Sequence, residues 1–579
     1  MKWNATLFPD GFPALGEYIH NLGLGFGVYS DAGIQMCMNG LPNQTGSLGH
    51  EQTDANTFAS WGADVLKYDN CYSEQDHGYP DADYNPTSSP APRFQTMRDA
   101  LNATGRDILY QVCEWGVDFP SAWAPSLGNT WRITNDIIPA WRTIFRQLNQ
   151  FVPSAMYAAP GRWPDLDMLE VGNDIFTEPE EQTHFSLWAI AKSPLIMGGV
   201  LNDTLHTIKP SSLAILKNAD VISYNQDSLG AAANLTRRYT EAGLDVWSGP
   251  LSGGRTVVAL LNWNNETVTG TLDLPDVGLQ SAGTAKNVWS NVTIQNVVTS
   301  YSAQIGSHGT LLLELGETTP AGTYQVDRCA ESSNRGVTFS NVYGLTDSSD
   351  YTLTVNLVQG SHRSQAVTVT SSASGKSKTV HASGNSAKLP IALVAGNKNT
   401  ITIQTSARVT SIHVASPSGT FFPSTAFSVA GTAAHYNCTP GLCAPVGSKI
   451  INLTQNGTAS LSVPRNNAGA SAAGNSRYVE ITYINNDVAL ATSWGFGTNT
   501  RNITVAVNGA APVRLEVPLS GRSSELFSPM RGWGDPATLG VLVGGFGSGS
   551  GEDEIVVGNA NGDVGVQAYG ADFVGLRVV

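Results

Sequence analysis

The stretch DVLKYDNCY, residues 64–72, combines an apolar run with side chains that could do chemistry. Lys67, Asp69 and Cys71 stand at alternate positions, and alternate residues of a β-strand project from the same face. A cation close to a carboxylate favours the charged form of that carboxylate, so this face predicts an ionised acid where a buried strand ends. Such a group could serve a reaction, or it could be the polar residue that caps the strand.

Four other predicted strands of the first 224 residues also end in an acidic side chain. The five strands are LGFGVYSD, ADVLKYDN, DILYQVCEW, NTWRITND and WPDLDMLEV, and their terminal acids are Asp31, Asp69, Glu114, Asp136 and Asp167. Helical stretches such as FPALGEYIHNLG, RFQTMRDALNATG, PAWRTIFRQLNQF and EQTHFSLWAIAK separate the strands. This alternation predicts a parallel sheet wrapped by helices. Acids at strand ends are typical of a (β/α)8 TIM barrel, whose chemistry gathers at the C-terminal ends of its strands.

A sixth strand candidate, SPLIMGGVL, still leaves the sheet short of the eight strands that a closed barrel has. The opening MKWNATLFPDGFPALGEYIH reads as a loop and a helix and has no apolar core of the signal-peptide type. We therefore expect residues 1–224 to be an incomplete barrel, with two βα units and a signal segment encoded upstream of Met1. On this expectation the chain by itself folds poorly or is inactive, because unpaired sheet edges favour aggregation, whereas the full gene product is an active enzyme.

The overall charge argues against two classes of partner. The formal net charge is −15, with 32 Lys and Arg among 579 residues, and no basic run stands out. This balance indicates neither nucleic acid nor an anionic membrane as a partner. No apolar run reaches the roughly 20 residues of a membrane span, since Lys192 and Pro194 interrupt LWAIAKSPLIMGGVL.

Sequons and cysteines indicate a secreted, extracellular glycoprotein. Asn-X-Ser/Thr occurs at Asn4, Asn43, Asn102, Asn202, Asn234, Asn265, Asn291, Asn437, Asn452, Asn456 and Asn502. So many acceptor sites along one chain are typical of passage through a secretory pathway. Cys438 and Cys443 are close enough in sequence for a local disulfide, and Cys37 with Cys71 is a second plausible pair.

The helical period disappears after about residue 224. Short strands with polar turns predict an antiparallel β-sandwich over residues 225–318, a second β-sandwich module over 319–418 and a third over 419–579. The last two modules could hold the protein on a polysaccharide or act as structural spacers.

Seven motifs follow one another along the first half of the chain: GFGVYSDAG, SWGADVLKYDNCY, QVCEWG, TWRITNDI, DLDML, SLWAIAKSPLIMGG and ISYNQDSLG. Together they resemble the retaining α-galactosidases of glycoside hydrolase family 27, over residues 8–318. The resemblance implies a barrel followed by a β-sandwich, and the whole layout is similar to secreted fungal members. The last module more loosely resembles a family 35-type carbohydrate-binding module.

The resemblance implies the two carboxylates of a double-displacement reaction. Asp69 matches the nucleophile, and Lys67 matches the residue that binds the sugar beside it. Asp136 matches the acid/base, which protonates the leaving oxygen and then activates water, although an aspartate there could also cap the following helix. Arg132, on the same strand face, matches a substrate-binding position; the alternative is a surface arginine.

Further positions match the family's sugar site. Glu114 matches a carboxylate that accepts a hydrogen bond from the sugar 2-hydroxyl; N-acetylgalactosaminidases of the family have a small residue there, so Glu114 favours galactose. The alternative for Glu114 is a plain strand-end glutamate. Trp115 is expected to add an apolar wall, while Tyr29 and Asp31 end the strand where the family shapes the site.

A second pair of acids competes for the acid/base role. From spacing alone, Asp165 or Asp167 in WPDLDML could be chosen. The resemblance implies that both acids lie near the pocket as support, and Asp167 is expected among the substrate-binding residues. The motif PDLD departs from the commoner Asn-Asp-Pro-Asp of the family. Cys37 and Cys71 match a family disulfide that ties a loop to the nucleophile strand and brings Cys71 to the substrate.

The resemblance implies a secreted enzyme that releases terminal α-D-galactose from galacto-oligosaccharides or galactomannan. Two carboxylates suffice for this chemistry, so we expect no metal and no organic cofactor. The family's Trp-Asp-Asp segment, which grips the 4- and 6-hydroxyls of galactose and distinguishes galactosidases from β-L-arabinopyranosidases, is absent from this sequence. A β-L-arabinopyranosidase, or a carbohydrate-binding protein with an inactive catalytic domain, is therefore the alternative. The expected partner is an oligosaccharide or polysaccharide.

Overall fold

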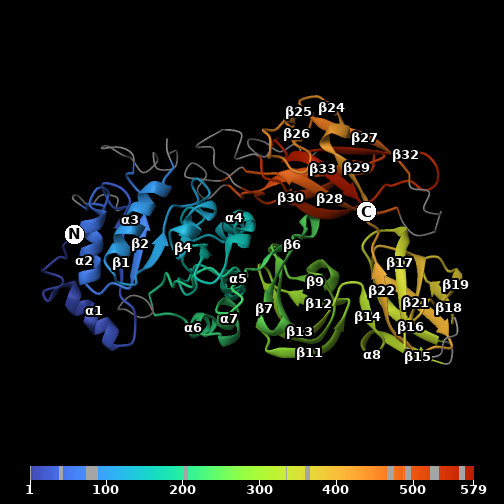
Figure 1. The fold of residues 1–579 in the computed structure, drawn as a ribbon, viewed down its shortest axis with the longest axis horizontal. Coiled ribbons are helices and arrows are strands. Elements are labelled where there is room, and N and C mark those ends of the chain that lie inside the picture. The colour runs from blue at the N-terminus through green and yellow to red at the C-terminus, as the bar shows by residue number, and fades with distance from the viewer. Residues whose placement is uncertain are drawn as a thin grey trace.

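The computed structural model describes residues 2–37, 44–73, 89–200, 207–333, 336–358, 365–465, 475–486, 488, 497–521, 534–559 and 568–579. A unit of alternating strands and helices comes first, and layers built almost only of strands follow it (Figure 1). Within the described part of the chain, no helix is both long enough and apolar enough to cross a membrane.

Five parallel strands form the sheet of the first unit, in the spatial order β1-β2-β3-β4-β5. Their bounds are Gly27–Asp31 (β1), Val65–Asp69 (β2), Leu109–Val112 (β3), Thr130–Arg132 (β4) and Trp163–Asp165 (β5). The helices are Gly11–Asn21 (α1), Glu51–Ser60 (α2), Ala91–Ala103 (α3), Trp141–Phe151 (α4), Glu178–Ile190 (α5), Pro210–Leu216 (α6) and Ala219–Asn225 (α7). Spatial order equals chain order, as in a barrel built from βα units. The five strands and four helices expected from the sequence are thus confirmed.

The sixth expected strand is wrong as a regular element. Residues 193–200 contribute one isolated parallel bridge, between Leu169 and Met197. Gly198 and Gly199 weaken this stretch because glycine offers a strand no side chain to pack. The amide of Leu169 donates to the carbonyl of Ile196 at 2.7 Å, so the chain runs beside the sheet edge without extending it.

Alternation along β2 separates the core from the strand face that carries the polar groups. Leu66 and Tyr68 are fully buried on the side of the sheet that faces the helices. They share one apolar cluster with Phe94 of α3 and Trp131 of β4. Lys67 projects from the other face because neighbouring residues of a strand point in opposite directions. One strand therefore supplies both core packing and a candidate site.

Three pairs of antiparallel sheets follow, and each pair encloses its own apolar cluster. The first pair contains Asn234–Tyr239 (β6), Leu244–Leu251 (β7), Arg255–Asn262 (β8), Val268–Asp273 (β9), Leu279–Asn287 (β10), Val292–Val298 (β11), Ser300–Ile305 (β12) and Thr310–Pro320 (β13). The second contains Thr323–Gln325 (β14), Ala330–Ser333 (β15), Gly336–Gly344 (β16), Ser348–Leu357 (β17), Ala366–Ser371 (β18), Ser377–His381 (β19), Ser386–Leu393 (β20), Gly396–Thr405 (β21) and Val409–Ala415 (β22), with the short helix Val326–Cys329 (α8). These layers are the β-sandwiches expected from the sequence.

The third pair forms the last module. It contains Thr420–Pro423 (β23), Ser428–Ala430 (β24), Ala434–Asn437 (β25), Ser448–Ile451 (β26), Thr458–Pro464 (β27), Arg477–Ile484 (β28), Arg501–Val507 (β29), Val513–Val517 (β30), Ala537–Val543 (β31), Glu552–Gly558 (β32) and Asp572–Val578 (β33). The module lies over β6 and beside α4, far from both in sequence (Figure 1).

Arg238 of β6 joins three parts of the molecule at this junction. Its guanidinium donates to both carboxylate oxygens of Asp245 at 2.7 Å and to Oδ1 of Asn149 on α4 at 2.9 Å. It also donates to the carbonyl of Glu516 on β30 at 3.2 Å. The Arg238 and Asp245 side chains are 3% and 1% exposed. Removing either partner would leave the other buried and uncompensated, so the packing of the last module depends on both.

We predict that Arg238→Met lowers the free energy of unfolding by about 3–5 kcal/mol, because it leaves the Asp245 carboxylate buried without its cation. Urea unfolding followed by tryptophan fluorescence measures the loss. Arg98→Met is the control, since Arg98 pairs with Asp99 at the surface and such pairs contribute about 0–1 kcal/mol. Equal losses in the two variants would contradict a structural role for the buried pair.

Candidate active site

Asp69 ends β2 inside a ring of proton donors. Its side chain is 8% exposed. The Tyr29 hydroxyl donates to Oδ2 at 3.0 Å, and Nε1 of Trp115 and the amide of Asn70 donate to Oδ1 at 2.9 and 3.0 Å. Nζ of Lys67 lies 3.9 Å from Oδ2. Hydrogen bonds and a nearby cation favour the charged form of a carboxylate, so the surroundings of Asp69 suit an anion.

The neighbours of Asp69 keep their protons. Burial, followed by the Asp69 carboxylate, raises the pKa of Tyr29, so the phenol remains a donor. Cys113 and Asp69 raise the pKa of Lys67 although burial lowers it, so the ammonium group remains charged. The face that the sequence predicted, a cation beside a carboxylate, is therefore present in the structure.

Arg132 ends β4 and organises a second acidic cluster. Its Nη2 lies 3.0 Å from Oδ1 of Asp136 and 2.8 Å from Oδ2 of Asp167. The Arg132 side chain is 4% exposed and that of Asp136 is 57% exposed. Asp167 raises the pKa of Arg132 against the effect of burial, so a buried cation presents an accessible carboxylate. Arg132 is not the surface arginine of the alternative interpretation.

Asp167 and Asp165 support this cluster from β5 and the residues after it. Oδ2 of Asp167 accepts from the amide of Ile137 at 2.7 Å, directly after Asp136. The amide of Asp167 donates to Oδ1 of Asp165 at 2.8 Å. Burial raises the pKa of Asp165 to about 6, but its side chain is buried among backbone partners while Asp136 opens to solvent. Solvent access favours Asp136 as the group that exchanges protons.

Cys113 connects the two clusters and was given no role by the sequence analysis. Burial and the carboxylates of Asp69 and Asp136 raise the pKa of its thiol, whereas Lys67 and Arg132 lower it. Nη1 of Arg132 lies 3.7 Å from its sulfur. Both carboxylates therefore act on one buried thiol. The strand register could have revealed the position of Cys113. Lys67 pairs with Gln111, so Cys113, two residues after Gln111, lies on the same face of the sheet as Asp69.

Glu114 lies on the other side of the strand from Cys113. It is fully buried, and neither carboxyl oxygen has a hydrogen-bond partner among the described residues. Its charged neighbours are Asp118 and Arg93, and burial raises its pKa well above the usual range. The structure does not bring Glu114 to the Asp69 cluster; its contact with the sugar 2-hydroxyl stays a prediction.

Trp115 and Asp167 both adopt left-handed backbone conformations, with φ of 64° and 82°. Such φ values cost bulky residues of order 1–3 kcal/mol, and they gather at functional sites where the surroundings enforce them. The turn after β3 directs the indole of Trp115 to Asp69, so Trp115 is a hydrogen-bond donor and more than the apolar wall expected. The same conformation in Asp167 directs its carboxylate to Arg132.

Two disulfides join Cys37 to Cys71 and Cys438 to Cys443, and Cys113 and Cys329 are free. The first follows the Asp69 strand. Asp31 supports it, since its carboxylate accepts the amides of Gly33 and Cys71 at 2.8 and 3.2 Å. The carboxylate of Asp31 lies close to both sulfurs, but these sulfurs are bonded to each other and offer no thiolate to a metal. Asp31 and this disulfide therefore fix the loop beside Asp69.

Helix α4 buries polar side chains behind the second cluster. Nη2 of Arg146 donates to the carbonyl of Asp136 at 3.2 Å. Asn499 of the last module donates to the carbonyl of Arg146 at 3.1 Å and to Oε1 of Gln150 at 3.0 Å. The side-chain amide of Asn149, through Nδ2, donates to the carbonyl of Thr498 at 3.1 Å. The backbone at Asp136 is thus connected, through α4, to a module more than 300 residues away in the chain.

The candidate site combines a buried carboxylate among donors with an accessible one beside a buried arginine, at two strand ends of one parallel sheet. Two carboxylates are the groups on which glycoside hydrolases rely. Residues 1–227 match the family model described as alpha galactosidase A, and residues 241–315 match the alpha galactosidase C-terminal beta sandwich domain. The chain belongs to the α-galactosidases of glycoside hydrolase family 27, which are retaining enzymes.

Relatives match along the whole chain. A protein of Aspergillus niger named "Probable alpha-galactosidase D" is 54% identical over 100% of this chain and 87% of its own length. "Alpha-galactosidase D" of Emericella nidulans is 48% identical over 100% of this chain and 86% of its own length. Among solved structures, alpha-galactosidase I from Mortierella vinacea is 32% identical and covers 54% of this chain and 82% of its own, with a TM-score of 0.48.

We predict that Glu114→Gln stabilises the protein near neutral pH. Because the pKa of Glu114 is raised above its ordinary value of 4.5, the folded state holds a proton that the unfolded chain releases. Stability is then full below the ordinary pKa and falls as the pH rises towards the folded pKa. A glutamine has no proton to release, so the variant's melting temperature should exceed that of the wild type near neutral pH, and the excess should vanish in acid.

Glu181→Gln is the matched control for this comparison. Glu181 is also buried, but its carboxylate accepts from the amide of Gly172 at 2.8 Å and from the Ser212 hydroxyl at 2.7 Å. Replacing a satisfied acceptor with an amide lowers the melting temperature. A Glu114→Gln protein that melts below the wild type near neutral pH would show that Glu114 is charged in the folded state.

Proposed function

We propose that the chain hydrolyses terminal non-reducing α-D-galactose by double displacement, with Asp69 as the nucleophile and Asp136 as the acid/base. The observation that carries this proposal is the contrast between the two carboxylates. Asp69 is buried and accepts three hydrogen bonds, while Asp136 reaches solvent beside Arg132. A nucleophile needs a permanent charge, and an acid/base must exchange protons with water.

In the first step an oxygen of Asp69 attacks the anomeric carbon. A carbon–oxygen bond to the enzyme forms, the glycosidic carbon–oxygen bond breaks, and Asp136 donates its proton to the departing oxygen. Tyr29, Trp115 and Lys67 hold the attacking carboxylate in place. They also stabilise the negative charge that returns to Asp69 when the intermediate breaks down.

In the second step water attacks the same carbon from the side that the leaving group has vacated. Asp136, now ionised, accepts a proton from this water, and the bond to Asp69 breaks. Nη2 of Arg132 lies 3.0 Å from Oδ1 of Asp136, and Asp167 holds Arg132 from its other side. The configuration at the anomeric carbon is retained because it is inverted twice.

Galacto-oligosaccharides and galactomannan are the substrates that we propose, since they carry terminal α-galactose. We also propose that the protein is secreted and that its four domains span residues 1–224, 225–318, 319–418 and 419–579. Most sequon asparagines within the described residues are accessible, whereas Asn502 is buried and cannot carry a glycan in the folded protein. Asn43 and Asn202 lie outside the described residues.

Asp69→Asn and Asp136→Asn should fail in different ways. Asp69→Asn removes the attacking anion, so turnover should be lost with every leaving group. Asp136→Asn should lower kcat/KM, which reports the first step, by about 10²–10⁴-fold on an alkyl galactoside but much less on a dinitrophenyl galactoside, whose leaving group needs no proton. Steady-state kinetics with both substrates separate these outcomes.

Asp165→Asn completes this test, because Asp165 is the rival acid. The proposal expects only a modest effect that does not depend on the leaving group. A leaving-group dependence in Asp165→Asn, together with its absence in Asp136→Asn, would overturn the assignment of the acid/base.

We further predict that Asn499→Ala lowers kcat several-fold with little change in KM. The substitution removes the hydrogen bonds from Asn499 to the carbonyl of Arg146 and to Oε1 of Gln150, which costs about 1–3 kcal/mol and loosens α4 behind Asp136. Asn397→Ala is the matched control, because Asn397 donates to Asp273 and Ser300 between two other sandwiches. Equal effects on kcat would show that the contact with α4 has no particular role.

A further inference from the structure

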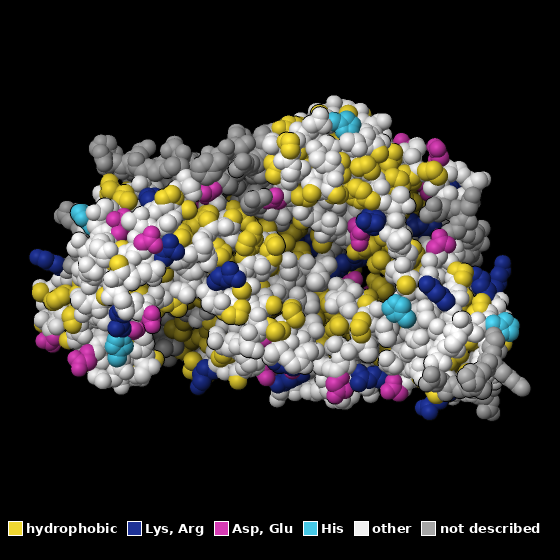
Figure 2. Space-filling view, viewed as in Figure 1, with side chains coloured by type: hydrophobic (Ala, Val, Ile, Leu, Met, Phe, Trp, Pro, Cys, Tyr) yellow, Lys and Arg dark blue, Asp and Glu magenta, His cyan; other side chains and the backbone are white. Residues whose placement is uncertain are grey.

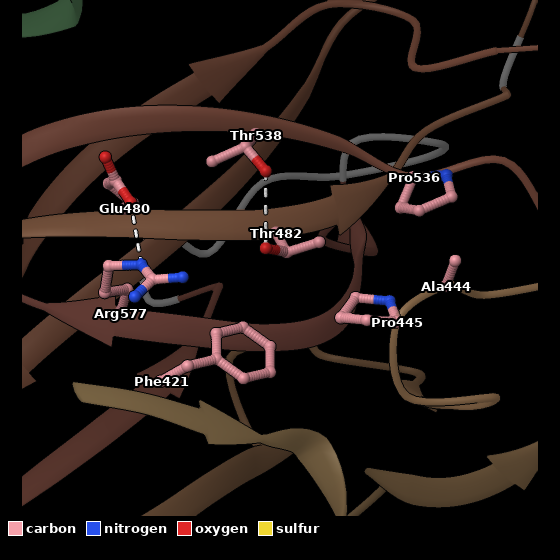
Figure 3. Close-up of a pocket in the computed structure, with 8 residues that line it drawn as sticks. All are labelled: Phe421, Ala444, Pro445, Glu480, Thr482, Pro536, Thr538 and Arg577. Atoms are coloured by element: carbon pink, nitrogen blue, oxygen red, sulfur yellow. Dashed lines mark hydrogen bonds and ion pairs between the residues drawn. The ribbon is translucent and has the colours of Figure 1, made fainter. Parts of the chain in front are cut away.

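The last module contains a pocket of about 460 Å³ that is separate from the candidate active site. It opens on the outer face of the sheet that contains β28, β31 and β33, and Figure 3 shows the residues that line it. A volume of this size lies within the range of small-ligand sites. None of the roles assigned to the catalytic residues uses it.

Phe421 of β23 provides an apolar surface in this pocket. A Cβ at position 575 would come within 2.6 Å of Cζ of Phe421, so the ring lies directly against the backbone of β33 and requires glycine there. In Figure 3 the face of the ring is turned towards the viewer, with Arg577 on one side and Pro445 on the other. The ring is half-buried, which leaves area for a ligand to pack on.

The polar groups around this ring balance one another. The Arg577 guanidinium lies 3.3 Å from Glu480, and both side chains are more than one third exposed. The hydroxyls of Thr482 and Thr538 lie 3.3 Å apart on neighbouring strands. The pocket thus offers hydrogen-bond donors and acceptors with no net charge.

The rest of the wall is held in place before any ligand arrives. The disulfide between Cys438 and Cys443 closes the loop that leads into Ala444 and Pro445, and Pro536 also lines the pocket, at the same end of the view in Figure 3. Proline has a fixed φ, so little conformational entropy is lost when such a wall is covered. A weak ligand gains affinity from a preformed site.

These features select for one class of ligand. Glu480 disfavours an anion and Arg577 disfavours a cation, so the ligand is neutral. It needs an apolar face for the Phe421 ring and hydroxyls at its edge for Glu480, Arg577 and the threonines. A hexopyranose unit has this form, because one face of the ring presents C–H groups while its hydroxyls project sideways.

The pocket also lies close to the junction with the catalytic half. Tyr478, two residues before Glu480 on β28, stacks on Arg237 of β6 with the guanidinium 4.6 Å from its ring. Glu480 shares a strand face with Tyr478, so a chain bound here is held near β6, the first strand of the sandwich that follows the barrel. Such tethering raises the local concentration of further sugar units.

We propose that this pocket binds a hexopyranosyl unit of a neutral galactose-bearing polysaccharide and holds the chain for the catalytic site. The choice of polysaccharide rests on the proposed function, whereas the pocket's chemistry requires only a neutral hexopyranose. The occupied unit could belong to a mannan backbone or to a galactosyl branch, and the test below distinguishes these sources.

The test measures the binding of galactomannan by affinity electrophoresis, with the full chain in an Asp69→Asn background so that hydrolysis does not interfere. Phe421→Ala should weaken binding at least tenfold, and Thr538→Val, which removes one exposed hydroxyl without disturbing the core, should weaken it several-fold. Tyr569→Ala is the matched control, an exposed aromatic of the same module outside the pocket. Unchanged binding in both Phe421→Ala and Thr538→Val would overturn the proposal.

Two further measurements separate this proposal from the proposed function. With Asp69 intact, Phe421→Ala should raise KM on galactomannan and leave kcat/KM on a nitrophenyl galactoside unchanged, whereas failure of the catalytic proposal would appear on both substrates. If the protein binds unbranched β-mannan and Phe421→Ala weakens this binding, the pocket holds a unit of the mannan backbone. If binding instead requires galactosyl branches on the polysaccharide, the pocket holds a branch.

Discussion

Parallel hydrogen bonding between β1, β2 and β3 fixes the positions of the polar groups in the candidate site. The register pairs Tyr29 with Lys67 and Lys67 with Gln111. Because side chains alternate along each strand, Tyr29, Lys67 and Asp69 then share one face. A slip of one residue would turn this set into the helical layer. The carboxylate of Asp69 survives burial because this register surrounds it with donors, and an unpaired buried charge would be far more costly.

The second carboxylate follows a different principle. Asp136 remains in solvent, and the structure controls it through a buried arginine whose charge is fixed by Asp167. A buried pair is costly to separate, so Arg132 cannot follow Asp136 outward. The two acids are thus set apart by their surroundings: Asp69 is buried among donors and Asp136 is open to solvent, a contrast that matches the two roles proposed for them.

Much of the catalytic half could be predicted from the sequence because its signals are local. Strand–helix alternation gave five strands, and spacing placed Lys67 and Asp69 on one face. What failed depended on packing. The stretch around Gly198 is apolar enough for a strand but has too little side chain to hold one. The sugar contact expected of Glu114 stays a prediction, and no sequence pattern shows that its neighbour Cys113 lies between the two acidic clusters. No sequence pattern along α4 reveals that its polar side chains contact the last module. A buried side-chain amide and an exposed one are the same residue type in a sequence.

Helix α4 has a consequence for how such a chain can change over generations. Its outward side carries Arg146, Asn149 and Gln150, groups that would tolerate water, so a gene that lost the last module could still yield a barrel that stays dissolved. That barrel would nevertheless have lost the brace behind the backbone of Asp136. Loss of the last module is therefore expected to disturb the backbone at Asp136 through the missing Asn499 contacts before it affects solubility. Relatives that align along the entire chain retain both the barrel and the last module.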